Sequence, residues 1–382
     1  MKSIYKSIGE LVERIDQRNT DGSVTNLIGV SIDKKFISSV ANVIGTDLTK
    51  YKVIEKYDFA VSLMQVSRDE KIPVACQKEF DKAIMSPAYP IFRVKDKSVV
   101  LPEYLEMWFM RPEFDREASF IAVGGVRGSM PWEEFANMKL PVPSIDEQLE
   151  IVNAYKAITD RIALKKQIND NLEATLTATF KKMFVEDDSV EFTTKKLYEL
   201  TKTIDNRGKT PPNDSVETPY PLIEIASLRT DGRIATYRNC SKYVTEETYK
   251  SWFRSGHPKQ KDILMSTVGS LAELKLFWGD KGSIAQNIVA FRCHDTNLPM
   301  YLYQYLLRKQ HELAAYEIGS VQASIKVSQV VEYDIAVPSN ELLEKFDKIA
   351  TQLTEQIYQN EADIDVCHRL GNMLLQRLTP KD

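Results

Sequence analysis

The sequence predicts a mixed α/β protein built from two similar globular domains and two long helices, one helix after each domain. Short motifs that occur twice in the same order predict the two domains, and two stretches with helical periodicity predict the helices. The composition agrees, because 43% of the 382 residues are hydrophobic, which is enough for each half to bury its own core.

The repeated motifs define the two domains. Residues 27–31 (LIGVS) return as 222–226 (LIEIA), 92–93 (FR) as 291–292, 101–105 (LPEYL) as 298–302 (LPMYL), and 140–144 (LPVPS) as 335–339 (IAVPS). The period is far longer than the roughly 20–50 residues of a solenoid repeat, and it is typical of a duplicated domain. We expect the first domain over residues 1–144 and the second over residues 195–338.

Strands and short helices are expected at matching places in both domains. Residues 27–32 and 222–226 have the pattern of buried strands, and so do residues 58–64 and 262–267. Helical spacing follows each Leu-Pro motif and predicts core positions for six side chains: Leu105, Trp108, Phe109, Leu302, Tyr305 and Leu306.

The first long helix is expected over residues 145–185, which contain no Gly or Pro up to position 184. Ser144 and Glu147 match a capping box at its start. Apolar residues in steps of three and four predict a coiled-coil seam, with Asn169 as a polar member that sets the register. The seam residues are Ile151, Tyr155, Ile158, Ile162, Leu172 and Leu176.

The second long helix is expected over residues 339–382 and has the same kind of seam, interrupted by Gly371. Asn360 is its polar member. The seam residues are Phe346, Ile349, Leu353, Leu370 and Leu374. Each stripe is too long for one domain to cover, so we expect the two helices to pair as an antiparallel coiled coil. The alternative is that each helix packs only on its own domain.

Charge is unevenly distributed along the chain, whose net charge is −4. Residues 1–144 carry 20 basic and 20 acidic side chains, and residues 190–338 carry 19 basic and 17 acidic ones. An acidic linker is expected at residues 186–194. The domains are thus neutral to slightly basic, and any contact with nucleic acid is expected to be local or shared with a partner.

The cysteine pattern and the missing sequence motifs argue against metal-binding, membrane-spanning, nucleotide-binding and hydrolytic proteins. Cys76, Cys240, Cys293 and Cys367 form no CxxC pattern, which favours free thiols in the reducing cytoplasm and no metal site. No apolar run reaches the roughly 18 residues of a membrane span. The stretch from Thr203 to Thr210 lacks the first glycine of a phosphate-binding loop, and we find no nucleophile elbow or zinc-protease motif.

The order of these motifs resembles the specificity subunit of type I restriction–modification systems. The resemblance rests on Gly124–Met130 and Gly319–Ile325, on the Pro-rich motif and long helix that follow each, and on residues 207–212 (RGKTPP), which are similar to the opening of the family's target recognition domains. The second copy departs from the first in lacking the Glu147-Gln148 pair and one proline.

The resemblance implies a non-catalytic subunit that determines DNA sequence specificity. Each target recognition domain would read one half of a bipartite site in double-stranded DNA, and the helix pair would set the spacer and dock two methyltransferase subunits. Restriction subunits would complete the complex. No cofactor is expected in this chain, because S-adenosylmethionine, ATP and Mg would be bound by the partner subunits.

Candidate DNA contacts are Arg, Lys and Gln side chains in expected loops, because these residue types read base edges in the major groove. In the first domain they are Lys34, Lys35, Gln65, Arg68 and Arg127. In the second domain they are Arg207, Lys209, Arg229, Arg233, Gln322 and Lys326. Solvated surface charge is the alternative interpretation of each.

Two other functions stay open from the residues alone. The chain could be a methyltransferase or nuclease with an unrecognised site. It could also be a coiled-coil adaptor or inhibitor of a restriction–modification enzyme that never binds DNA, although the near-neutral domains argue against an acidic DNA mimic.

Overall fold

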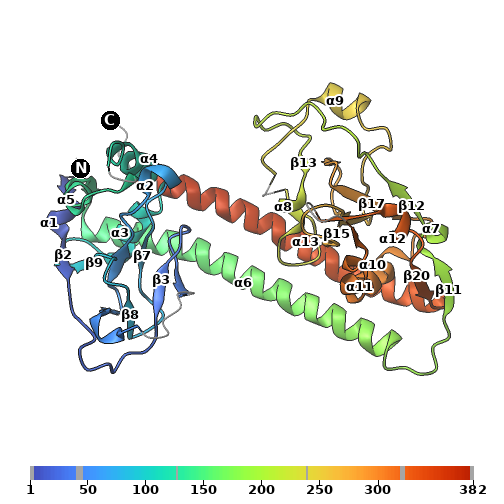
Figure 1. Cartoon of the computed structure of the whole chain (residues 1–382), viewed down its shortest axis with the longest axis horizontal. Helices are drawn as coiled ribbons and strands as arrows, with labels where there is room; N and C mark the ends of the chain where they lie inside the picture. The colour runs from blue at the N-terminus through green and yellow to red at the C-terminus, as the bar shows by residue number, and fades with distance from the viewer. Residues whose placement is uncertain (1–3, 40–45, 126–127, 238–239, 319–322, 379–382) are drawn as a thin grey trace. The chain divides into compact units, whose positions relative to one another are not determined.

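A computed structural model describes residues 4–39, 46–125, 128–237, 240–318 and 323–378 of the chain (Figure 1). Two compact units make up the protein: residues 1–162 with 366–382, and residues 163–365. Each unit contains one α/β head and a part of both long helices, α6 (Ile145–Phe184) and α13 (Asn340–Gln376). Each long helix is therefore divided between the two units, whereas the sequence analysis predicts the helices as segments separate from the domains.

The first head begins with a strand and a one-turn helix and ends with the strand that leads into α6. Its elements are β1 (Ile4–Ser7), α1 (Ile8–Leu11), β2 (Val12–Ile15), β3 (Ile28–Val30), β4 (Phe36–Ser38), the 3₁₀ turn η1 (Leu48–Lys50), β5 (Lys52–Glu55), β6 (Phe59–Val61), α2 (Val66–Asp69), β7 (Val74–Cys76), β8 (Lys82–Met85), β9 (Ile91–Val94), α3 (Pro102–Phe109), α4 (Pro112–Ile121), α5 (Trp132–Asn137) and β10 (Lys139–Val142).

The second head begins and ends with the same kinds of element as the first, but several elements between them differ. Its elements are β11 (Thr193–Lys196), α7 (Leu197–Leu200), β12 (Thr201–Ile204), β13 (Leu222–Ile223), α8 (Ile225–Leu228), α9 (Glu246–Ser251), β14 (Ile263–Ser266), β15 (Leu274–Leu276), β16 (Ser283–Ile284), β17 (Ile288–Cys293), α10 (Pro299–Arg308), α11 (Gln310–Ala314), β18 (Glu317–Ile318), β19 (Ser324–Ile325), α12 (Val327–Val330) and β20 (Asp334–Val337).

A four-stranded antiparallel sheet forms the centre of each head, in the order β2-β9-β6-β7 in the first and β12-β17-β14-β15 in the second. Side chains alternate between its two faces. In β6, Phe59 and Val61 belong to the core beneath α3, α4 and α5, and Ala60 belongs to a smaller core with β3, β5 and β8. In β14, Ile263 and Met265 alternate with Leu264 in the same way.

The duplication predicted from the motifs extends to side-chain contacts. In the first head, Asp58 accepts hydrogen bonds from Arg93 Nε (2.8 Å) and Nη2 (2.9 Å). In the second head, Asp262 accepts them from Arg292 Nε (3.1 Å) and Nη2 (2.6 Å). Each pair fixes the central strand to its neighbour, so the recurring Phe-Arg motif has the same structural role in both copies.

A second repeated contact joins each Leu-Pro helix to the strand before a long helix. The hydroxyl of Tyr104 in α3 donates to the carbonyl of Pro141 in β10 over 3.0 Å. The hydroxyl of Tyr301 in α10 donates to the carbonyl of Ala336 in β20. Five of the six predicted core side chains of α3 and α10 are buried, and Tyr305 is partly buried against the core. The strand predicted over residues 222–226 is shorter than expected, because Ile225 begins the helical turn α8.

The fold class is confirmed as mixed α/β with two long helices. Ser144 and Glu147 form the predicted capping box, with Ser144 N donating to Glu147 Oε2 over 3.0 Å. Within the second unit the rings of Phe184 and Phe346 lie 5.4 Å apart, and Asn169 bonds to Asn360. Because the end of α6 meets the start of α13, the two helices run antiparallel there.

Most of the predicted seam residues are buried or half-buried. Leu176 and Phe346 are buried in the core of the second unit, where Leu172 and Leu353 also pack. Ile151, Tyr155 and Leu374 pack against the core of the first unit, and Ile158 and Ile162 are half-buried.

The seam prediction is wrong for Ile349 and Leu370, which are 39% and 47% exposed. Their neighbours Ala350 and Gly371 occupy the buried positions instead. These two positions continue a seven-residue repeat with four other buried residues, Leu343, Ile357, Ile364 and Leu378. Gly371 is therefore a member of the seam and does not interrupt it. A Cβ atom added there would lie 3.7 Å from the ring of Tyr155.

Candidate nucleic-acid interface

Two loops of each head emerge at the same edge of its sheet. Strands β2 and β6 both run antiparallel to β9, and Ile15 and Ala60 both lie opposite Ile91. Their carboxyl ends therefore lie at one edge, about 10 Å apart at the usual strand spacing. In the second head, Ile204 and Leu264 both lie opposite Ala290. We call these surfaces the loop edges: residues 16–19 and 62–70 in the first head, and 205–209 and 267–271 in the second.

At the loop edge of the first head, the glycine-rich segment after α4 packs on the segment after β6. Met130 N donates to the carbonyl of Leu63 over 2.8 Å, and a Cβ on Gly128 would lie 2.5 Å from Ser67 Oγ. The predicted contacts Gln65 and Arg68 are both exposed there. Arg68 pairs with the adjacent Asp69 over 2.9 Å, and Arg127 lies outside the described residues.

Two predicted contacts, Lys34 and Lys35, lie in the turn between β3 and β4 and differ in exposure. Lys35 is exposed. The side chain of Lys34 is only 8% exposed, and its Nζ forms an ion pair with Asp115 (2.7 Å) and a hydrogen bond with the carbonyl of Phe109. Burial lowers the pKa of Lys34. The prediction that Lys34 contacts DNA is wrong, because its ammonium group ties the hairpin to α4.

At the loop edge of the second head, Asp205 holds Arg207. Asp205 Oδ1 accepts hydrogen bonds from the backbone N (3.0 Å) and Nε (2.9 Å) of Arg207, and Oδ2 accepts from Nη2 (2.7 Å). Burial opposes ionisation of Asp205, but the hydrogen bonds from Arg207 outweigh it and the pKa of Asp205 is lowered. The predicted contact Lys209 follows in the same loop and is exposed.

Arg229 and Lys326 lie on segments joined to the second loop of this edge. Arg229 is exposed, and its Nε donates to Ser270 Oγ over 2.6 Å. The backbone N of Ile325 donates to the carbonyl of Thr267 over 2.8 Å, and Lys326 follows with an exposed side chain. Gln322 lies outside the described residues. The second head thus brings Arg229 and Lys326 towards one surface.

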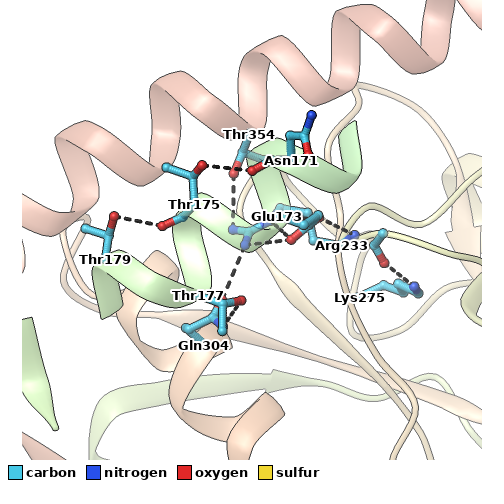
Figure 2. Close-up of polar contacts among 10 residues, drawn as sticks. Asn171, Glu173, Thr175, Thr177, Thr179, Arg233, Lys275, Gln304 and Thr354 are labelled. Carbon is cyan, nitrogen blue, oxygen red and sulfur yellow. Dashed lines mark hydrogen bonds and ion pairs between the residues drawn. The ribbon is translucent and has the colours of Figure 1, made fainter. Parts of the chain in front are cut away.

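The prediction that Arg233 contacts DNA is wrong. Arg233 is 1% exposed, and its Nε donates to Glu173 Oε2 of α6 over 3.0 Å (Figure 2). The guanidinium also bonds to Gln304 of α10 and Thr354 of α13, each over 3.3 Å. Arg233 therefore fixes its loop to both long helices within the second unit and cannot reach a base edge.

A buried lysine holds the loop that precedes Arg233. Nζ of Lys275 in β15 donates to the carbonyls of Thr230 and Gly232, and burial lowers the pKa of this lysine. Hydrogen bonds to the residues that follow Arg229 therefore hold the loop that carries it.

The sequence analysis missed two arginines, one at the loop edge of the first head and one beside the loop edge of the second. Arg18 follows β2 and pairs with Asp16 over 3.0 Å, at the position that Arg207 occupies after β12. The signal was available, because an Asp-x-Arg triplet begins one residue after the strand in both heads. Arg254 is exposed, and its Nη2 donates to the carbonyl of Arg207 over 3.2 Å. No sequence pattern joins Arg254 to Arg207.

The described residues contain neither a candidate metal site nor a helix that could span a membrane. No group of three or more His, Cys, Asp or Glu side chains within the described ranges could hold a metal ion. In the same part of the chain, every helix is too short or too polar to cross a membrane.

Comparison with known proteins identifies relatives among the specificity subunits of type I restriction enzymes. Residues 189–360 match the family described as type I restriction modification DNA specificity domain. The chain is 21% identical to the type I restriction enzyme MjaIX specificity subunit of Methanocaldococcus jannaschii over 302 residues, which cover 74% of this chain and 69% of that protein. It is 24% identical to the type I restriction enzyme HindI specificity subunit of Haemophilus influenzae over 191 residues, which cover 48% of this chain and 41% of that protein.

The fold is also found in a solved structure. The crystal structure of the S subunit of a type I restriction–modification system from M. genitalium matches with a TM-score of 0.58 and 12% identity, covering 99% of this chain and 96% of that chain. The family match over residues 189–360 includes the second head, and both sequence relatives are specificity subunits, so the resemblance inferred from the motifs is confirmed.

Proposed function

We propose that this chain is the DNA sequence-specificity subunit of a type I restriction–modification complex. The observation that carries the proposal is the duplicated head. The ion pairs Asp58–Arg93 and Asp262–Arg292 join the same two strands of the central sheet in both heads, whereas the loops at the end of the sheet differ. A shared sheet with different loops suits two domains that recognise different DNA sequences. Each head would then read one half of a bipartite site.

Linking two modest readers raises the affinity for a site that contains both halves, because the second head binds at a high effective concentration. This suits heads that are nearly neutral overall. The helix pair would set the spacing between the two half-sites.

The chain would itself be non-catalytic and would act through partners. The proposed partners are double-stranded DNA, two methyltransferase subunits that use S-adenosylmethionine, and restriction subunits that use ATP and Mg. The exposed face of α13 suits a helical partner, because Val366, Leu370 and Met373 are 44%, 47% and 50% exposed at helical spacing. We propose that a methyltransferase helix covers this apolar stripe.

The test is selection from a library of random duplex DNA by the full chain in complex with its methyltransferase subunits. The expected product is one bipartite motif with a fixed spacer, methylated only when the methyltransferase subunits are present. Exchanging residues 1–144 for the first head of a relative should change one half of the motif and leave the other half unchanged.

Two outcomes would contradict the proposal. Methyl transfer by this chain alone would make it an enzyme. Complex formation with the methyltransferase but no selection of any DNA sequence would make it an adaptor or inhibitor.

A further inference from the structure

Arg207 at the loop edge of the second head uses one side of its guanidinium and leaves the other open. Its Nε and Nη2 donate to the carboxylate of Asp205, at 2.9 and 2.7 Å. Its Nη1 donates to no atom of the described residues. The side chain is 35% exposed. An arginine has five N–H donors in a rigid fork, so the end of the fork formed by Nη1 and Nη2 stays available for a bidentate contact.

The loop that carries Arg207 is tied to a second loop by four hydrogen bonds. Asn206 Nδ2 donates to the carbonyl of Gly256 (2.8 Å), and Ser255 N donates to Asn206 Oδ1 (2.9 Å). Ser255 Oγ donates to the carbonyl of Asp205 (2.6 Å), and Arg254 Nη2 donates to the carbonyl of Arg207 (3.2 Å). A guanidinium held in this way is already oriented before it meets a ligand, which lowers the entropic cost of binding.

The matching arginine of the first head, Arg18, is bonded at both of its Nη nitrogens, although its side chain is 37% exposed. Arg18 Nη2 pairs with Asp16 (3.0 Å), and Arg18 Nη1 donates to the carbonyl of Lys50 (2.8 Å). Both nitrogens at the end of the fork are thus bound inside the head, and Arg18 joins β2 to the turn before β5. The same Asp-x-Arg triplet therefore leaves Nη1 without a partner among the described residues in the second head, whereas Nη1 is bonded in the first.

We propose that Arg207 reads a guanine in the half-site of the second head, with Asp205 as its positioning residue, whereas Arg18 reads no base. This inference rests on the proposed function. Guanine presents two acceptors, O6 and N7, in the major groove, and their spacing matches the end of an arginine fork. The exposed Lys209 and Arg254 beside it carry further positive charge suited to the adjacent phosphates.

The experiment compares four variants of the full chain in complex with its methyltransferase subunits: Arg207→Ala, Arg207→Lys, Asp205→Asn and the matched control Arg18→Ala. Each selects from a random duplex library, and the readout is the base preference at every position of both half-sites. Thermal unfolding of each complex is measured alongside.

Arg207→Ala should reduce the preference for guanine at one base pair of the second half-site by roughly 10- to 100-fold. Arg207→Lys should act at the same base pair, because an ammonium group cannot make the bidentate contact. Asp205→Asn should weaken the same preference by a smaller factor without lowering the unfolding temperature as a core defect would. Arg18→Ala should leave both half-sites unchanged and lower only the unfolding temperature.

Three results would overturn the inference. The second half-site could contain no guanine that responds to Arg207. Binding of Arg207→Ala could fall equally for all sequences with a smaller dependence on salt, as for a phosphate contact. Arg18→Ala could change a base preference in the first half-site. If the unmutated chain selects no bipartite sequence, the proposed function fails and the inference fails with it. If the complex selects a bipartite motif that the Arg207 variants leave unchanged, the inference is wrong and the proposed function stands.

Discussion

Asn360 of α13 donates a hydrogen bond from Nδ2 to Oδ1 of Asn169 in α6 over 2.8 Å. Both residues are buried, at 1% and 6% exposure. Asn169 Nδ2 donates in turn to Glu361 Oε1, and Lys165 Nζ donates to Asn360 Oδ1, each over 2.8 Å. A fully paired polar group inside an apolar seam favours one register, because sliding either helix would leave these groups unpaired.

Asn360→Leu should therefore destabilise the protein by about 1–3 kcal/mol, because it leaves Asn169 Oδ1 buried without a donor. The double variant with Asn169→Leu should recover part of this loss, since both buried amides are then gone. Chemical unfolding gives both values. Gln359→Leu on the exposed neighbouring position is the control and should change stability by less than about 0.5 kcal/mol. Equal losses for Asn360→Leu and Gln359→Leu would show that the amide pair contributes nothing specific.

Arg233→Met should destabilise the second unit by about 3–5 kcal/mol, because it leaves the carboxylate of Glu173 without its buried partner. Adding Glu173→Leu should restore part of the stability. Arg229→Met, which changes an exposed arginine of the same loop, is the control and should have a small effect. Thermal unfolding measures all three, and an unfolding temperature of Arg233→Met equal to that of Arg229→Met would contradict the structural role of Arg233.

Gly371→Ala should stabilise α13 by about 0.5–1 kcal/mol, because alanine restricts the unfolded chain more than glycine does. The seam has room for the added methyl group, which would lie 3.7 Å from Tyr155 and 3.8 Å from Ile158. Gly371→Leu should instead overfill the seam and cost about 1–3 kcal/mol. A destabilising alanine, measured by chemical unfolding, would show that the helices approach more closely here than the structure has them.

Phe346→Asp and Ile349→Asp should differ sharply, although both residues fit the apolar pattern in the sequence. Phe346 is 1% exposed and contacts the rings of Phe180 and Phe184, whereas Ile349 is 39% exposed. A carboxylate at position 346 would be buried without a partner, at a cost of several kcal/mol. Soluble expression and unfolding temperature give the comparison. If Ile349→Asp were as damaging as Phe346→Asp, position 349 would belong to a buried surface after all.

His257 should make the stability of the second unit depend on pH. Burial lowers its pKa, and its ring bonds to the carbonyl of Tyr249 and the hydroxyl of Ser283, each over 2.8 Å. The unfolded chain then binds the proton first, so stability is full above the ordinary histidine pKa of about 6.5 and falls as the pH drops below it. His257→Gln should flatten this dependence between about pH 7 and 5, whereas His311→Gln on the exposed face of α11 should not. An unchanged slope in His257→Gln would assign the effect to other groups.

The sequence by itself determined the features that are local or repeated. The recurring motifs gave the two heads, because each motif forms the same contact in both copies, as Tyr104 and Tyr301 do. The start of α6 followed from Ser144 and Glu147, since a capping box needs only residues three positions apart. The polar seam members Asn169 and Asn360 were also identified, because an amide in an apolar stripe is visible in the sequence alone.

Only the tertiary structure decided which cations face solvent and which helix positions face the partner helix. Lys34, Arg207 and Arg233 all carry a positive charge, yet Lys34 is buried and paired with Asp115, and Arg233 is buried and paired with Glu173, residues far away in the sequence. The seam moved from Ile349 to Ala350 for a related reason. Hydrophobicity favours the larger side chain, but a close approach of two helices favours the smaller one, and that approach is set by the packing of both helices together.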